Sequence, residues 1–232
     1  MPPRKKSALS KAQRKAMRGI AHDVVDDVVE DKQYVATTEN IQLFHNKASY
    51  TGKYLQAIEQ GVDDGDVSPT GNTGNGLQTI RLGSSIRLKN INIRLWLSNK
   101  LDRPNVMYKG TLFWYSVNQP PTDATVFKTQ SNKMLDRLNT NKIQILDTFI
   151  VRSTNNYAVD ANNHEHSYLA TLNKSWKGNG VKVQYDQQTT FSNAPEQREL
   201  GMSIVCYDAY GTLQTDNISS YALQSLITFQ DA

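Results

Sequence analysis

The sequence predicts an all-β protein made of two packed antiparallel sheets, with a basic arm in front of them. From about residue 32, short runs rich in Ile, Val, Leu, Thr and Tyr alternate with clusters of Gly, Asn, Ser and Thr, as in proteins built from short strands. The helical periods that a parallel sheet would require between its strands are missing. A chain of 232 residues that is 38% hydrophobic is long enough and apolar enough for a sizeable core.

Seven runs are the clearest strand candidates: 79–98, 107–117, 142–151, 167–176, 180–186, 200–209 and 218–231. An eighth strand is expected within residues 33–60, where QYVATT, IQLFHN and KYLQAIEQ compete. Eight strands of this length favour a sandwich, a jelly roll or a closed barrel. The long connections at 61–76, 118–141 and 152–166 are expected at the ends of that body.

One strand candidate, IRLKNINIRLWL, changes its inward face part of the way along. Ile86 and Leu88 alternate on one phase, whereas Ile91 and the apolar residues after it follow the other phase. Because side chains alternate strictly along a regular strand, this change predicts a bend or bulge near Lys89 and Asn90.

Charge is segregated at the beginning of the chain. The first 18 residues hold seven basic side chains and no acid, whereas the other 214 residues hold 19 basic and 22 acidic side chains. The net charge of +4 therefore belongs to the arm, and a polyanion contacted by the arm alone is the expected partner. The candidate nucleic-acid-binding residues are Arg4, Lys5, Lys6, Lys11, Arg14, Lys15 and Arg18.

The arm contains a helix-start signal. Ser10 and Gln13 are spaced as a capping box, which predicts a helix from about residue 11. Lys11, Arg14, Lys15 and Arg18 would then share one face, and an apolar track from Ala12 to Val28 would be free to dock elsewhere. Gly19 is interpreted as a hinge between this cationic part and the acidic residues 23–31. Basic tails also serve as nuclear import signals or stay solvated, and both alternatives remain open.

Composition also limits where the protein works. The single cysteine, Cys206, lies in the apolar run GMSIVCY and is expected to be a buried thiol, which excludes an internal disulfide framework. No apolar run reaches the length of a membrane span, and the N-terminus lacks the apolar stretch of a secretory signal. We therefore expect a soluble protein without a membrane partner.

The candidates for metal binding and catalysis are weak. Asp63, Asp64 and Asp66 could hold Ca²⁺ at a subunit interface, but they lack the EF-hand spacing, and a flexible acidic loop is the favoured interpretation. His164 and His166 flank Glu165 without a visible third ligand. No catalytic motif is present, so no catalytic residue and no cofactor are expected.

Three aromatic residues in strand runs, Trp96, Trp114 and Tyr115, have two interpretations. Aromatic residues in strands usually belong to a core or an interface. The alternative, a platform on which nucleic-acid bases stack, is the less favoured of the two.

The order of these features resembles a known family. A basic arm and short helix are followed by DKQYV, GSSIRLKNINIRLWL, GTLFWYSVNQPP, KIQILDTFIV, GVKVQYD and SYALQSLITFQDA. This pattern is similar to the single jelly-roll coat proteins of the satellite tobacco necrosis virus type, a group that includes capsid proteins of many circular single-stranded DNA (CRESS-DNA) viruses. The resemblance covers nearly the whole chain, as an ordered series of strands and loops.

The resemblance implies an eight-stranded antiparallel jelly roll with sheets BIDG and CHEF, in residues 32–232, behind an arm in residues 1–31 that faces the genome. It also implies a T=1 icosahedral shell of about sixty copies around a single-stranded genome, with DNA favoured over RNA, and a location in the virion. Import of the arm by a host receptor would add the host nucleus during assembly. Some relatives bind Ca²⁺ between subunits, but no ligand set of theirs matches this sequence.

Three rival functions remain. One is a jelly-roll binding module, lectin-like or a trimeric ligand, with an incidental basic tail. Another is a nucleic-acid-binding protein that never forms a shell. An enzyme is the weakest, because nothing in the sequence supports catalysis.

Overall fold

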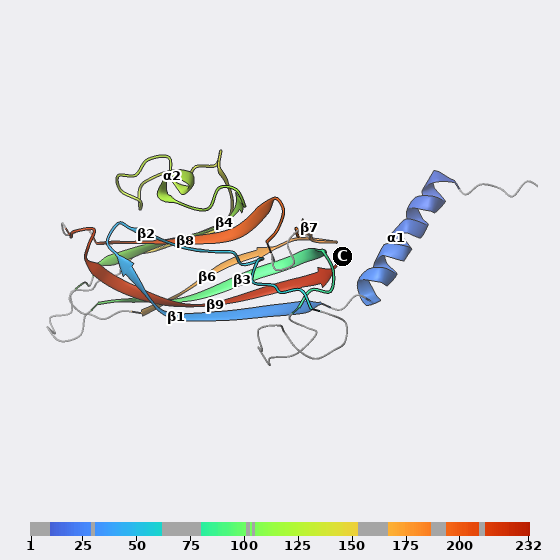
Figure 1. Cartoon of the computed structure of the whole chain (residues 1–232), viewed down its shortest axis with the longest axis horizontal. Coiled ribbons are helices and arrows are strands. Elements are labelled where there is room, and N and C mark those ends of the chain that lie inside the picture. The colour runs from blue at the N-terminus through green and yellow to red at the C-terminus, as the bar shows by residue number, and fades with distance from the viewer. Residues whose placement is uncertain are drawn as a thin grey trace, which may run out of the picture. The chain divides into compact units, whose positions relative to one another are not determined.

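The computed structural model describes residues 10–28, 31–61, 80–100, 103, 105–152, 167–186, 194–208 and 212–232. The chain divides into two compact units, Met1–Asp31 and Lys32–Ala232. In the first unit, α1 (Lys11–Val28) is a helix of 18 residues. The second unit consists of two antiparallel sheets stacked face to face (Figure 1).

The first sheet contains the longest strands of the protein. Its strand order is β1-β9-β3-β6, with β7 also paired to β3. The bounds are β1 (Lys32–Phe44), β9 (Asn217–Asp231), β3 (Ser85–Asn99), β6 (Ser167–Ser175) and β7 (Val181–Gln184). The last strand in the chain, β9, therefore lies between β1 and β3 in the interior of the sheet.

The second sheet has the strand order β2-β8-β4-β5. Its strands are β2 (Ala48–Gly52), β8 (Arg198–Asp208), β4 (Val106–Ser116) and β5 (Ile143–Val151). Alternate residues of both sheets, such as Ile93, Leu95 and Leu112, point into the space between them and are fully buried. They form one apolar core, as expected for a sandwich of two sheets.

β6 and β7 form one interrupted edge. β6 pairs with β3 from Asn90 to Ser98, and β7 pairs with the same strand from Ser85 to Leu88. With these two counted as one strand and the strands lettered in chain order from B, the sheets are BIDG and CHEF. The protein is thus an eight-stranded antiparallel jelly roll, as expected, although the assignment of a single strand to residues 33–60 was wrong.

The assignments within residues 33–60 and 167–186 had different outcomes. Residues 33–60 supply two strands rather than one, since QYVATT and the IQLF of IQLFHN both belong to β1 and β2 follows it. KYLQAIEQ is not a strand, because residues 54–57 form a turn. The runs 167–176 and 180–186, predicted as two strands, are confirmed as β6 and β7, which share one edge of β3.

The predicted change of phase in β3 is confirmed. The pairing of β3 with β9 shifts register between Leu88 and Asn90. Leu88 is buried before the shift, and Ile91 and Ile93 are buried after it. The bulge thus keeps apolar side chains inward on both sides of Lys89.

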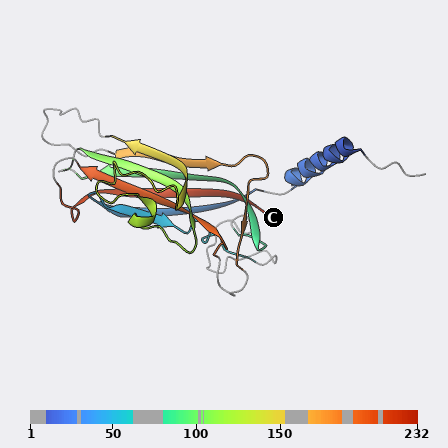
Figure 2. The ribbon, with the colours of Figure 1, turned by 90° about the horizontal axis from the view of Figure 1, so that it is seen from above.

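The connection between β4 and β5, residues 117–142, covers the outer side of the second sheet (Figures 1 and 2). This covering segment contains α2 (Asp123–Val126). Its Val126 and Phe127 are buried against Phe113 of β4 and Val205 of β8 in a second apolar cluster. The expectation that residues 118–141 lie at an end of the body is therefore wrong, because these apolar side chains gain more by packing on the sheet.

Candidate nucleic-acid interface

The helix of the arm begins where the capping box predicts. The backbone N–H of Gln13 donates to Ser10 Oγ over 3.2 Å, and the Ser10 N–H donates to Gln13 Oε1 over 3.0 Å. These reciprocal bonds satisfy amides that a helix end otherwise leaves unpaired.

Four of the seven predicted cations lie on this helix. Lys11, Arg14, Lys15 and Arg18 are all exposed. Their spacing of three and four residues puts them on one face of a regular helix. Arg4, Lys5 and Lys6 lie outside the described residues.

The proposed hinge at Gly19 is not present in the described helix, because α1 continues from Lys11 to Val28 without a break. The intrinsic cost of one glycine, about 1 kcal/mol relative to alanine, does not end the helix. Ile20 on the predicted apolar track is 64% exposed.

The candidate metal ligands Asp63, Asp64 and Asp66, together with His164, Glu165 and His166, lie outside the described residues. Calcium binding by the three aspartates stays a prediction. Within the ranges that the structure describes, no cluster of three His, Cys, Asp or Glu side chains could hold a metal ion. Among the same residues, no helix has both the length and the apolar character needed to cross a membrane.

Cys206 is a buried strand thiol, as predicted. It lies fully buried in β8, and its Sγ donates to the carbonyl oxygen of Phe44. Burial raises the pKa of the thiol to about 12, which suppresses the thiolate that a nucleophile requires.

Glu199, at the start of β8, is a buried carboxyl with a structural role. One of its oxygens accepts the backbone N–H groups of Leu55 (2.7 Å) and Leu200 (2.8 Å), and the other accepts that of Gln56 (3.0 Å). These bonds hold the turn at residues 54–57 against the sheet. Burial nevertheless raises the pKa of Glu199 from 4.5 to about 7, outweighing the bonds that lower it.

Glu199→Gln is expected to flatten the pH dependence of stability. A carboxyl with a raised pKa in the folded state stabilises the fold below about pH 4.5, and this contribution is lost as the pH rises through about 7. The loss should amount to about 2–3 kcal/mol. Urea unfolding of unassembled subunits between pH 4.5 and 8 measures it, with exposed Glu196→Gln as the control. If the free energy of unfolding depended on pH in the same way for the wild-type protein, Glu199→Gln and Glu196→Gln, the raised pKa of Glu199 would be contradicted.

The three aromatic residues differ in their exposure. Trp114 (3% exposed) and Tyr115 (6% exposed) are buried, as expected for core residues. Trp96 is 57% exposed, on the side of β3 that points away from the core. The sequence held a signal for this difference, because Trp96 shares its phase with the polar residues Asn92 and Arg94.

Comparison with known proteins gives only distant likenesses. No family model matches the chain, and no curated protein matches it. Among solved structures, the chain is similar to one of Desmodium yellow mottle tymovirus, at 9% identity over 100% of this chain and 95% of that chain, with a TM-score of 0.33. It is also similar to one of Mud crab tombus-like virus, at 12% identity over 99% of this chain and 88% of that chain, with a TM-score of 0.33. The jelly-roll assignment therefore depends on the strand pairing described above.

Proposed function

We propose that this chain is a viral coat protein. Its jelly-roll unit self-assembles into a small icosahedral shell, and residues 1–31 form an arm that faces and binds a packaged single-stranded genome. The observation that carries the proposal is the segregation of seven cations, without one acid, in the 18 residues that lead into a jelly roll.

The chemistry of the arm suits a phosphate backbone. Exposed cations on one helical face displace the counterions that surround a nucleic acid, and this gain does not depend on base sequence. Binding by the arm should therefore be strong at low salt and blind to sequence. A coat protein needs that behaviour, since it must package a whole genome.

The finer points follow from the resemblance described above. We infer sixty copies in a T=1 shell, with DNA favoured over RNA, although both present the same phosphates to the arm. The protein would reside in the virion, and an import receptor that recognises the basic arm would bring it to the host nucleus for assembly. The role is structural rather than catalytic.

Size-exclusion chromatography of the purified protein tests the proposal, with absorbance at 260 and 280 nm recorded before and after nuclease treatment. We expect a particle of megadalton size that protects nucleic acid from the nuclease. A species of one to three subunits without nucleic acid, persisting at low salt, would refute the proposal and favour a lectin-like module. A small complex whose nucleic acid is digested by the nuclease would indicate a nucleic-acid-binding protein that forms no shell.

A further inference from the structure

The two sheets differ in what lies over their outer sides. The covering segment packs on the second sheet, whereas several described side chains on the outer side of the β1-β9-β3-β6 sheet are exposed. Arg94 and Gln224 are exposed there, and Trp96 and Leu169 are 57% and 86% exposed. We call this side, from β1 across β9 and β3 to β6 and β7, the open face.

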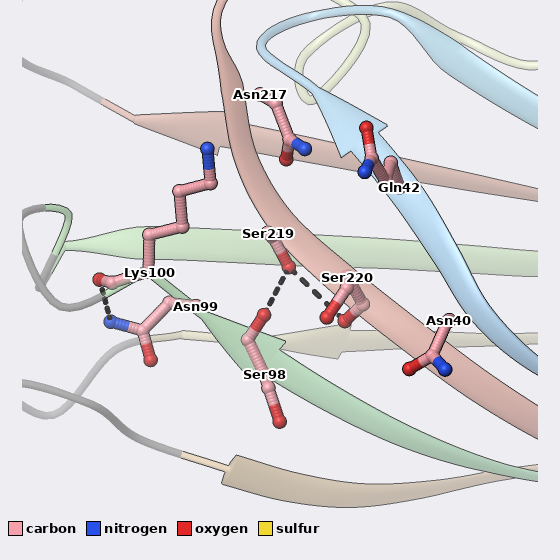
Figure 3. A pocket seen from close by; sticks show the side chains of 8 residues that line it. All are labelled: Asn40, Gln42, Ser98, Asn99, Lys100, Asn217, Ser219 and Ser220. Carbon is pink, nitrogen blue, oxygen red and sulfur yellow. Dashed lines mark hydrogen bonds between the residues drawn. The ribbon is translucent and has the colours of Figure 1, made fainter.

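The open face carries a polar hollow at the end where β3 finishes and β9 begins (Figure 3). The hollow has a volume of about 450 Å³. Amide, hydroxyl and ammonium side chains line it: Asn40, Gln42, Ser98, Asn99, Lys100, Asn217, Ser219 and Ser220. The lining thus combines many hydrogen-bonding groups with a single charge.

Local structure builds the hollow. The pairing of β1 with β9 shifts register between Thr38 and Ile41, and Asn40 within this bulge has φ of 59°. Such a bulge re-aims side chains at a sheet edge. On the neighbouring strands, Ser219 Oγ donates to the carbonyl oxygen of Ser98 over 2.7 Å, which joins β9 to β3 beneath the hollow.

A second hollow of about 360 Å³ adjoins the first and shares Asn40, Ser98 and Ser220 with it. Trp96 lines this second hollow. The two hollows therefore form one continuous depression, with amide and hydroxyl groups along it and an exposed indole beside them. An exposed indole offers a flat surface on which a base can stack.

The charges of the open face are mostly positive. Arg94 lies two residues from Trp96 on the same side of β3, and Arg87 is paired in register with Lys182 of β7. Lys100 in the hollow adds a further positive charge. The described acid on this face is Glu39, which lines the second hollow. A phosphate backbone is complementary to this distribution.

We propose that the open face is a second binding site for single-stranded nucleic acid, with one base stacked on Trp96. The amides of Asn40 and Gln42 contact base edges, and Arg94 and Lys100 contact flanking phosphates. The proposal deepens the proposed function, and its biological meaning depends on that function. A carbohydrate could use the same amides and the indole, but it would gain little from these cations.

The test uses the full-length chain with the seven arm cations changed to glutamine, so that the arm no longer dominates binding. Binding of an oligothymidylate of 30 nucleotides is followed by fluorescence anisotropy and by quenching of intrinsic tryptophan fluorescence. We expect quenching, and we expect Trp96→Ala to abolish it and to weaken binding roughly 5- to 150-fold, the range for one stacked base. Leu169→Ala is the matched control, because Leu169 pairs with Trp96 across the sheet and is exposed but has no ring.

Three outcomes would overturn the inference. Equal affinities for the parent and Trp96→Ala would exclude stacking. Unchanged affinity together with a failure of Trp96→Ala to assemble would make the open face a contact between subunits. Quenching by a neutral oligosaccharide but not by the oligonucleotide would assign the hollow to a carbohydrate.

The same measurements separate this inference from the proposed function. Unassembled subunits can bind the oligonucleotide through the open face whether or not they later form a shell. If particles form and protect nucleic acid while Trp96→Ala binds as its parent does, the second site alone is wrong. If no particle forms but Trp96-dependent binding persists, the coat function alone is wrong.

Discussion

Changing all seven arm cations to glutamine is expected to abolish most of the salt-sensitive binding of single-stranded DNA. Each cation that meets a phosphate contributes about −0.7 to the slope of log affinity against log salt, so the arm accounts for roughly −5. That slope corresponds to about a 10³-fold change in affinity between 50 and 200 mM salt. Titrations of oligothymidylate at several salt concentrations should therefore show the slope becoming less negative by up to roughly 5, and particles should lose absorbance at 260 nm.

The matched control exchanges the same seven residues between lysine and arginine. This variant keeps every charge, and counterion release depends on charge rather than on side-chain shape. It should retain the slope and the packaged nucleic acid. Loss of binding in the exchanged variant, or an unchanged slope in the glutamine variant, would show that the arm does not bind through its charge.

Gly180→Ala is expected to destabilise the jelly roll by about 2–5 kcal/mol, because backbone strain and overpacking act together at this position. Gly180 has φ of 70°, where a residue with a Cβ is strained. An added Cβ would also lie 2.4 Å from the carbonyl oxygen of Leu88, which is backbone beside the bulge of β3. Urea unfolding monitored by the fluorescence of the buried Trp114 measures the loss.

Gly178→Ala separates the two causes. Gly178 lies in the same loop between β6 and β7 and has φ of 63°, but a Cβ added there would meet nothing within 4 Å. It should cost only the backbone strain, about 1–2 kcal/mol. Equal losses at the two glycines would mean that close approach to Leu88 contributes nothing.

Local patterns predicted the regular parts of the fold well. The alternation in β3 is clear enough to place both the strand and its bulge near Lys89, because apolar side chains must stay inward on both sides. The Ser10 and Gln13 spacing predicted the helix start for a similar reason, since both partners of the capping box lie within four residues. Signals of this kind depend on near neighbours in the chain.

Features that depend on distant partners were missed. Residues 54–57 look apolar enough for a strand, but their amides bind the Glu199 carboxylate, 144 residues away from Leu55. The covering segment gave no sign of its position, because the surface that it buries belongs to β4 and β8. QYVATT and IQLFHN, which both contribute to β1, were treated as competing candidates for one strand. The bulge at residues 38–41 interrupts the alternation between them.

The same contrast between signals from near neighbours and features that depend on distant residues applies to the candidate sites. The arm was visible in the sequence because its charge is local, whereas the open face combines residues from β1, β3 and β9 that only the strand order brings together. Trp96 was noticed as an aromatic residue, but its exposure depends on which of the two sheets the covering segment packs on.

The place of β9 in its sheet bears on how the protein is made. Of the described strands, β9 leaves the ribosome last, yet it is the partner that both β1 and β3 require. Until Asn217–Asp231 has been translated, the two strands have no partner between them, and their edges are open to other chains. The edges of β1 and β3 that face each other across β9 are therefore exposed to aggregation through most of synthesis, and a chain that stops before β9 cannot complete this sheet.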